Sequence, residues 1–208
     1  MPAAGKKTVE DVDVQGKRVL VRVDFNVPMK RGTMEISDDS RIRAALPTIE
    51  YLRDRDAVVI LCSHFGRPGG KVVQEMRLEP VQEHLEELLG ERVLDAEGPG
   101  APRPAELTSA LVPGDIALLE NLRFDPREEQ NDDDFAQELA SLADLYVNDA
   151  FGAAHRAHAS THAVTRHIPA VAGFLMAREL AMLSRALESE DRPVVAAIGG
   201  AKVSDKIQ

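Results

Sequence analysis

The chain has 208 residues, and 44% of them are hydrophobic, which is enough to bury one good-sized core in a single domain. Its 35 acidic residues outnumber its 25 lysines and arginines, and the formal charge of -10 argues against broad attraction to nucleic acid or to an anionic membrane surface. No apolar run reaches the roughly 18 residues that a membrane span needs, and the start of the chain lacks the apolar core of a signal peptide, so we expect a cytoplasmic protein.

Short apolar runs alternate with segments of helical periodicity along the chain. In chain order, strands are predicted at 18–23, 57–62, 115–119, 144–147 and 193–198. Helices are predicted around 42–49, 81–89, 135–142 and 174–187, and a weaker candidate at 104–111 is also compatible with a loop. Cys62, the only cysteine, can form no internal disulfide and is expected to be a small buried residue on its strand.

Capping residues support two of these helices. The acidic run at 131–134 offers an N-cap and negative charge for the helix that follows it, and Gly90 suits the left-handed end of the earlier helix. Strands that alternate with helices form right-handed βαβ units. The sequence therefore predicts an α/β fold: a doubly wound, mainly parallel sheet with helices on both faces, as in a Rossmann-like three-layer sandwich.

Polar and cationic residues follow every predicted strand. The segments after the five strands read DFNVP, SHFGRPGG, ENLRF, NDAFGAAHR and GGAKVSDK. Because the carboxyl ends of parallel strands share one edge of a sheet, these loops should meet at one place. The side chains expected there, with Arg41 joining from the start of a helix, are Asp24, Asn26, Arg41, His64, Arg67, Arg123, Arg156, Lys202 and Lys206.

Such a cluster reverses the acidic character of the chain locally. Arginine forks match phosphate and carboxylate groups, so the predicted ligand is a small anion with several negative charges. Any single arginine is better explained by a surface ion pair of little energetic value. The set as a whole favours an anion site, because all of its members except Arg41 follow a strand end.

Two other patterns favour different sites only weakly. The spacing of His155, His158 and His162 resembles a metal site, but no cysteine or acidic pair accompanies these histidines. Gly199 and Gly200 lack the rest of a G-x-G-x-x-G dinucleotide motif. Lys206 alone is also compatible with a solvated helix position.

Six segments together resemble one known family. VRVDFNVP, DDSRIRAALPTI, SHFGRP, LLENLRF, NDAFGAAHRAHAS and GGAKVSDKI, in this order and spacing, are similar to the N-terminal half of the phosphoglycerate kinases, from about Val19 onward. The resemblance implies a glycolytic and gluconeogenic enzyme that transfers a phosphoryl group between 1,3-bisphosphoglycerate and ADP. The products are 3-phosphoglycerate and ATP, the reaction is reversible, and Mg²⁺ accompanies the nucleotide. It also implies a protein that is monomeric at full length.

The resemblance assigns roles to individual residues. Asp24 and Asn26 would hold the hydroxyl and carboxylate end of the substrate, and Arg41 would lie beside the transferring group. The segment SHFGRP places Phe65 and Gly66 in the same binding loop. The distant phosphate would be anchored by His64, Arg67, Arg123 and Arg156.

Lys202 would meet the transferring group and Lys206 would reach the nucleotide phosphates, so Arg41 and Lys202 are the candidate catalytic residues and Lys202 and Lys206 the candidate nucleotide-binding ones. No metal ligand is predicted within the chain.

The same resemblance suggests how the chain divides. Residues 1–190 would form the phosphoglycerate-binding domain, and 191–208 would begin a nucleotide-binding domain whose remainder, with the Mg²⁺ ligands, is not in this sequence. We therefore expect the isolated chain to bind substrate without transferring a phosphoryl group. The alternative is a non-catalytic anion-binding module that keeps only the phosphoglycerate site.

Overall fold

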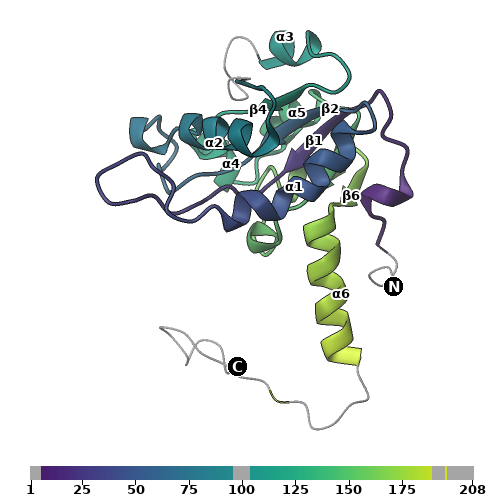
Figure 1. Cartoon of the computed structure of the whole chain (residues 1–208). Coiled ribbons are helices and arrows are strands. Elements are labelled where there is room, and N and C mark those ends of the chain that lie inside the picture. The colour runs from purple at the N-terminus through teal and green to yellow at the C-terminus, as the bar shows by residue number, and fades with distance from the viewer. Residues whose placement is uncertain (1–5, 96–103, 189–194, 196–208) are drawn as a thin grey trace.

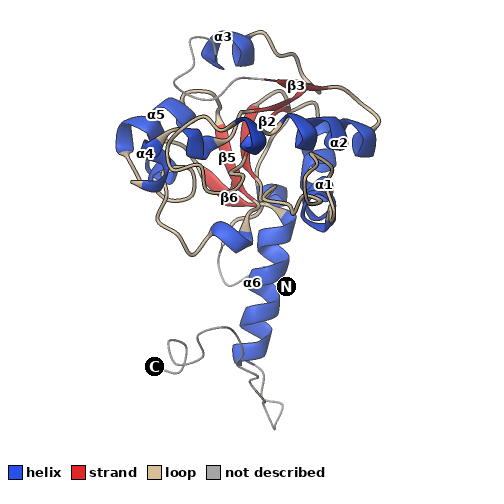
Figure 2. Cartoon of the chain, turned by 90° about the vertical axis from the view of Figure 1, so that its left-hand side faces the viewer, coloured by secondary structure: helices blue, strands red, loops and turns tan. Residues whose placement is uncertain are grey.

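A computed structural model describes residues 6–95, 104–188 and Val195. Its strands form one parallel sheet in the order β3-β4-β2-β1-β5-β6 (Figures 1 and 2). The strands are β1 (Arg18–Arg22), β2 (Val58–Cys62), β3 (Val93–Asp95), β4 (Ile116–Leu118), β5 (Leu145–Asn148) and β6 (Ala170–Ala172).

Helices connect the strands. The α-helices are α1 (Ser40–Arg53), α2 (Glu79–Leu89), α3 (Pro104–Ser109), α4 (Pro126–Glu129), α5 (Asp133–Ala140) and α6 (Phe174–Glu188). Short 3-10 turns lie at η1 (Val9–Asp11), η2 (Gln74–Met76), η3 (Leu122–Phe124), η4 (Phe151–Ala153) and η5 (Ala163–Arg166).

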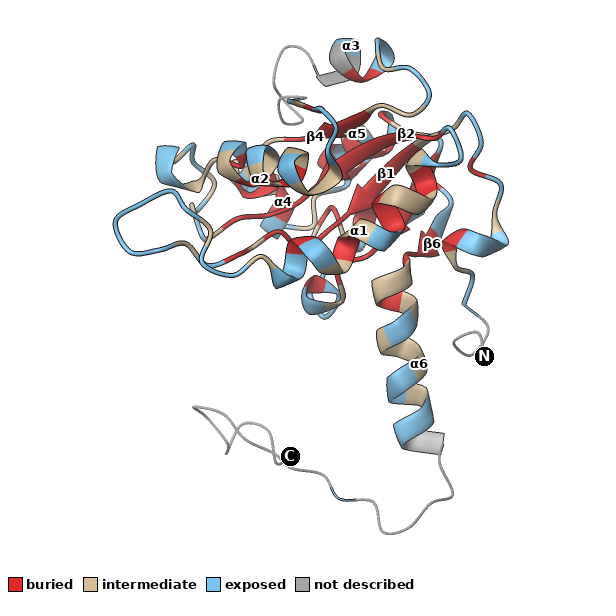
Figure 3. Cartoon of the chain, in the orientation of Figure 1, coloured by how far each residue is buried: buried red, intermediate tan, exposed pale blue. Residues whose placement is uncertain are grey.

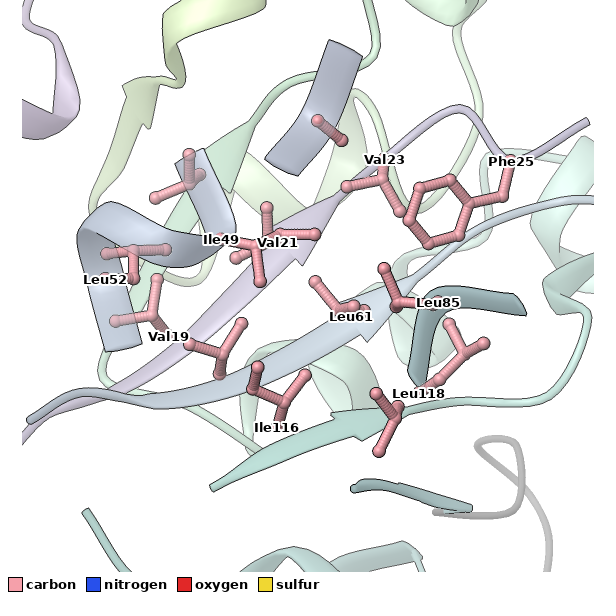
Figure 4. Packing of buried hydrophobic residues seen from close by; sticks show 14 of the residues in the cluster. Val19, Val21, Val23, Phe25, Ile49, Leu52, Leu61, Leu85, Ile116 and Leu118 are labelled. Atoms are coloured by element: carbon pink, nitrogen blue, oxygen red, sulfur yellow. The ribbon is translucent and has the colours of Figure 1, made fainter. Parts of the chain in front are cut away.

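The sheet is buried on both faces, which explains the continuous apolar runs of its central strands. Val19 and Val21 face a core shared with α1 and α2, where Ile49, Leu52 and Leu85 pack against the strands (Figure 4). Leu20 points to the opposite face, where α5 and η5 complete a second core. This alternation gives three layers, and it confirms the predicted doubly wound α/β fold.

Four predicted strands are confirmed to within one residue at each end, whereas β3 and β6 were not predicted. Each of these two has only three residues, too few for a recognisable period. The predicted strand at 193–198 lies outside the described residues except for Val195, which is exposed. Residues 191–208, the proposed start of a second domain, fall outside them in the same way.

Both predicted caps are confirmed. The Asp132 side chain accepts a hydrogen bond from the Phe135 N–H at 2.9 Å and caps α5. Gly90 ends α2 in the left-handed conformation, with φ 68°. Cys62 is fully buried in β2, and this burial raises the pKa of its thiol to about 12, so the predicted role as a small core residue is confirmed.

The order of the strands locates the functional edge. β1 lies between β2 and β5; the chain continues from β1 to α1 on one face of the sheet and from β5 to η5 on the other. The point where the winding reverses in this way is where open α/β sheets bind their ligands. The loops that follow β1, β2, β4 and β5 all leave the sheet from that edge.

α6 extends away from the three layers (Figures 1 and 3). Its first turn is anchored: Phe174 packs edge-on against Tyr51 of α1, with ring centroids 5.1 Å apart, and the buried Asp149 carboxylate accepts from the Met176 N–H. Farther along, Met182 and Leu183 are exposed. In the described part of the chain, no helix has the length and apolarity to cross a membrane.

Candidate functional site

Hydrogen bonds join three of the strand-end loops. The Asn26 side-chain oxygen, after β1, accepts from the Gly66 N–H at 2.9 Å. The Gly66 carbonyl, after β2, accepts from Arg123 Nη1 at 2.8 Å, and Arg123 follows β4. The backbone of Gly66 thus connects the side chains of Asn26 and Arg123. The loops after β1, β2 and β4 therefore meet at this edge, as predicted.

The buried side chain of Asn121 hydrogen-bonds to the backbone of the loops after β2 and β4. Its Oδ1 accepts from the N–H groups of Phe65 and Arg123 at 3.0 and 3.1 Å. Its Nδ2 donates to the carbonyls of Phe65 and Met76 at 2.7 and 2.9 Å. Two donated and two accepted bonds engage both ends of this amide, and the residue is 2% exposed.

Gly66 occupies a position that only glycine suits. Its φ of 63° is left-handed, and a Cβ there would lie 2.9 Å from the Met76 sulfur. Phe65 beside it is buried in the core, and Asn121 takes both its backbone N–H and its carbonyl. Phe65 and Gly66 thus fix the backbone of the loop that also carries His64 and Arg67.

Asp24 and Arg41 form an ion pair between the loop after β1 and the first turn of α1, with Arg41 Nη1 2.7 Å from Asp24 Oδ2. The Arg41 side chain is half exposed, whereas that of Asp24 is largely covered. Gly152, after β5, lies so close that a Cβ there would be 2.8 Å from Asp24 Oδ2. The pair therefore sits between the loops that follow β1 and β5.

His64 is 8% exposed and lies among cations. Its Nδ1 is 3.0 Å from Nη2 of the buried Arg22. Burial lowers the pKa of His64 to about 2, and the charges of Arg22, Arg123, His158 and Arg156 act in the same direction. The ring is therefore neutral at physiological pH, in a site whose charge comes from arginines.

Arg123 is a largely buried cation, with its side chain 5% exposed. Burial lowers the pKa of its guanidinium, and Glu129 opposes this shift. Arg123 Nε forms an ion pair with Glu129 Oε1 at 3.1 Å, but this buried N–H has no hydrogen-bond partner among the described residues. Such a group gains from an additional anionic partner.

Arg67 and Arg156 are exposed. Among residues 6–95, 104–188 and Val195, neither side chain has a hydrogen-bond or ion-pair partner. The charge of Arg156 lowers the pKa of both His64 and Arg123, although burial is the larger cause in each case. Lys202 and Lys206 lie outside the described residues.

The buried residues beneath the site were not predicted from the sequence. They are Arg22, Asn121, Glu128 and Ser160, all at most 2% exposed. Arg22 could have been found from the sequence, because a charged residue next to the apolar residues of a central strand must have partners when it is buried. Glu128 and Ser160 could not, since they lie in polar stretches typical of surface loops.

Chemically, the arrangement suits an anion. The cations Arg22, Arg123 and Arg156 act on the neutral ring of His64, and the Asp24 carboxylate after β1 pairs with Arg41. Within the described segments, no three His, Cys, Asp or Glu side chains lie close enough to hold a metal ion.

The sequence profile described as "Phosphoglycerate kinase" matches residues 9–208. The chain belongs to the phosphoglycerate kinase family. The phosphoglycerate kinase of Moorella thermoacetica is 59% identical over 202 residues, which cover 97% of this chain and 51% of the relative. That of a Roseiflexus species is 59% identical over 204 residues, with the same two coverages.

Solved structures of the family share the fold. The phosphoglycerate kinase of Coxiella burnetii superposes with a TM-score of 0.85 at 40% identity, over 97% of this chain and 50% of that one. The enzyme of Pyrococcus horikoshii gives the same TM-score at 37% identity, over 96% and 50%. The chain thus spans about half the length of the phosphoglycerate kinases it matches.

Proposed function

We propose that this chain forms the phosphoglycerate-binding part of a phosphoglycerate kinase, which transfers a phosphoryl group reversibly between 1,3-bisphosphoglycerate and ADP. The observation that carries the proposal is the cationic cluster around His64 on a chain whose formal charge is -10. Family membership supplies the substrate class. In this proposal residues 1–190 form the substrate domain and 191–208 begin the nucleotide domain.

The ligand would lie along the carboxyl edge of β1, β2, β4 and β5. Asp24 and Asn26 would receive its hydroxyl and carboxylate end. The distant phosphate would meet four side chains, His64, Arg67, Arg123 and Arg156. Two features support this placement: the unsatisfied Arg123 Nε, and the absence of side-chain partners for Arg67 and Arg156 within the described parts.

The chemistry fits a site without a general base. In the direction that consumes ATP, the attacking group is the carboxylate of 3-phosphoglycerate, which is already ionised at neutral pH. Catalysis then depends on positioning and on stabilising the negative charge of the transferring phosphoryl group. Arg41 is our candidate for that task within the described residues, because its half-exposed guanidinium flanks Asp24.

Nucleotide binding belongs to a separate part of the proposal. Lys202 would contact the transferring group and Lys206 the nucleotide phosphates. Mg²⁺ would neutralise phosphate charge when bound with ATP or ADP, and we propose that its protein ligands belong to the nucleotide domain. We therefore expect the 208-residue chain alone to bind 3-phosphoglycerate without consuming ATP in a coupled assay, and rapid turnover would contradict that.

Calorimetric titration with 3-phosphoglycerate tests the proposed site. Arg123→Ala and Arg67→Ala should each weaken binding by about 1–3 kcal/mol, because a charged phosphate oxygen loses a charge-assisted partner. The matched control is Arg92→Ala, an exposed arginine before β3 at the opposite edge of the sheet. Equal affinities in all three variants would remove Arg67 and Arg123 from the site.

A further inference from the structure

Arg22 is a buried arginine at the carboxyl end of β1, only 1% exposed. Its guanidinium donates in three directions. Nη1 donates to the Val23 carbonyl, Nε donates to Ser160 Oγ at 2.9 Å, and Nη2 lies 3.0 Å from His64 Nδ1. The side chain therefore connects the loop after β2 with the segment after β5.

The contact with His64 has only one possible direction. A guanidinium carries donors and no acceptor, so His64 Nδ1 must accept and cannot carry a proton. The single proton of the neutral ring is then on Nε2. Burial and the nearby cations, which lower the pKa of His64 to about 2, agree with a ring that stays neutral.

The Nε2–H group is available to a ligand. No described residue accepts a hydrogen bond from it, whereas Nδ1 is engaged by Arg22. Arg123 and Arg156 act electrostatically on the same ring. A neutral donor thus stands among the cations that would meet an anion.

A buried carboxylate holds Arg22 in place through a hydroxyl. Ser160 Oγ accepts from Arg22 Nε and donates to Glu128 Oε1 at 2.6 Å. The Ser160 N–H donates to the other Glu128 oxygen at 2.9 Å, and the Tyr146 hydroxyl donates to the Ser160 carbonyl at 2.7 Å. Arg22 and Glu128 thus compensate each other's buried charge, and every group that joins them is satisfied.

We propose that Arg22 is a positioning residue: it fixes His64 as an Nε2–H donor toward the anion site, and Ser160 with Glu128 fixes Arg22. The inference extends the proposed function, which supplies the identity of the anion. It concerns how the site is prepared, because Arg22 reaches the ligand only through the ring of His64. The arrangement is complete in the free protein, so binding should require no change of tautomer.

The test is a long-range ¹H–¹⁵N correlation spectrum of the full 208-residue chain labelled with ¹⁵N-histidine, with His64 assigned by comparison with His64→Asn. We expect an unprotonated Nδ1 and a protonated Nε2 at pH 7, unchanged at pH 5. A proton on Nδ1, or protonation of the ring with a midpoint near 6.5, would overturn the proposal.

Substitutions test separately the contributions of Arg22 and of Ser160 to the tautomer of His64. Arg22→Lys should produce a mixture of tautomers at His64, because a lysine cannot reach both Ser160 and His64. The control Arg18→Lys changes the other end of the same strand, where the side chain is partly exposed beside Asp144, and should leave His64 unchanged. Ser160→Ala retains Arg22 and should also mix the tautomers; an unaltered spectrum in that variant would refute the support assigned to Ser160 and Glu128.

Adding 3-phosphoglycerate distinguishes this proposal from the one it extends. The Nε2 resonance should shift on saturation while Nδ1 stays unprotonated. The expected tautomer combined with an Nε2 resonance that ignores the ligand would refute the proposed ligand at this site and leave the Arg22–His64 assignment standing.

Discussion

Arg41 and Asp24 neutralise each other at the edge of the sheet that carries the strand-end loops, where Arg41 Nη1 lies 2.7 Å from Asp24 Oδ2. The pair joins the first turn of α1 to the loop after β1. Gly152 approaches from the loop after β5, and a Cβ there would come within 2.8 Å of the same carboxylate oxygen. The Asp24 carboxylate can thus occupy this position only because residue 152 is a glycine.

We predict that Gly152→Ala weakens 3-phosphoglycerate binding by roughly 1 kcal/mol, about fivefold, with little change in stability. The added methyl group must displace the Asp24 carboxylate, whereas Gly152 itself is exposed and has no left-handed φ to lose. Calorimetry and thermal unfolding on the same samples measure both quantities. Unchanged affinity would show that Asp24 does not contact the ligand.

Asn121 should matter for stability more than its position in a loop suggests. Asn121→Ala leaves the buried polar groups that it served without partners, which should cost at least about 1–3 kcal/mol of the free energy of unfolding. Gln74→Ala, at an exposed position, should change it by less than about 0.5 kcal/mol. Urea unfolding compares the two, and equal losses would contradict the role assigned to Asn121.

His64 should make the stability of the chain sensitive to acid. Its pKa is about 2 in the folded chain and near 6.5 when unfolded. Between these values only the unfolded chain binds the proton, so the free energy of unfolding falls as the pH drops below about 6.5. One such proton contributes a slope of up to about 1.4 kcal/mol per pH unit.

His64→Asn removes that proton, and its amide oxygen can still accept from Arg22. We therefore expect a shallower loss of stability between pH 7.5 and 5.5 than in the unchanged chain, measured by urea unfolding at both pH values. His155→Asn, at an exposed histidine, serves as the control. Parallel slopes for the chain and for His64→Asn would mean that His64 titrates normally in the folded state.

Arg123 should not be replaceable by lysine. Arg123→Lys keeps a positive charge but loses the planar fork with which Arg123 donates to Gly66 and faces Glu129. We expect it to recover only part of the affinity for 3-phosphoglycerate that Arg123→Ala loses. Full recovery in calorimetry would show that charge alone matters at this position.

The central architecture was predictable because burial on both faces leaves a clear trace in sequence. β2 is a continuous apolar run, β1 has three apolar residues between two arginines, and α5 begins at an acidic cap, so the patterns for strands, helices and their boundaries agree. β3 and β6 are edge strands of three residues, and their pairing depends on neighbours distant in sequence. No local pattern could reveal them.

The exposed members of the candidate site were also predictable, since polar residues directly after strands must share one edge of a parallel sheet. The contacts among them were not. That Asn26 holds Gly66, or that Ser160 links Arg22 to Glu128, depends on loops more than 30 residues apart in sequence. Sequence spacing carries no information about such pairings.

The most direct test of the whole account is a titration of the ¹⁵N-labelled chain with 3-phosphoglycerate, followed by amide chemical shifts. We predict saturable shifts concentrated in the loops after β1, β2, β4 and β5, around Asn26, Gly66, Arg123 and Arg156. Amides near Arg92, at the opposite edge of the sheet, should stay in place. A spectrum that does not change, or shifts centred away from these loops, would contradict the claim that this edge is the phosphoglycerate site.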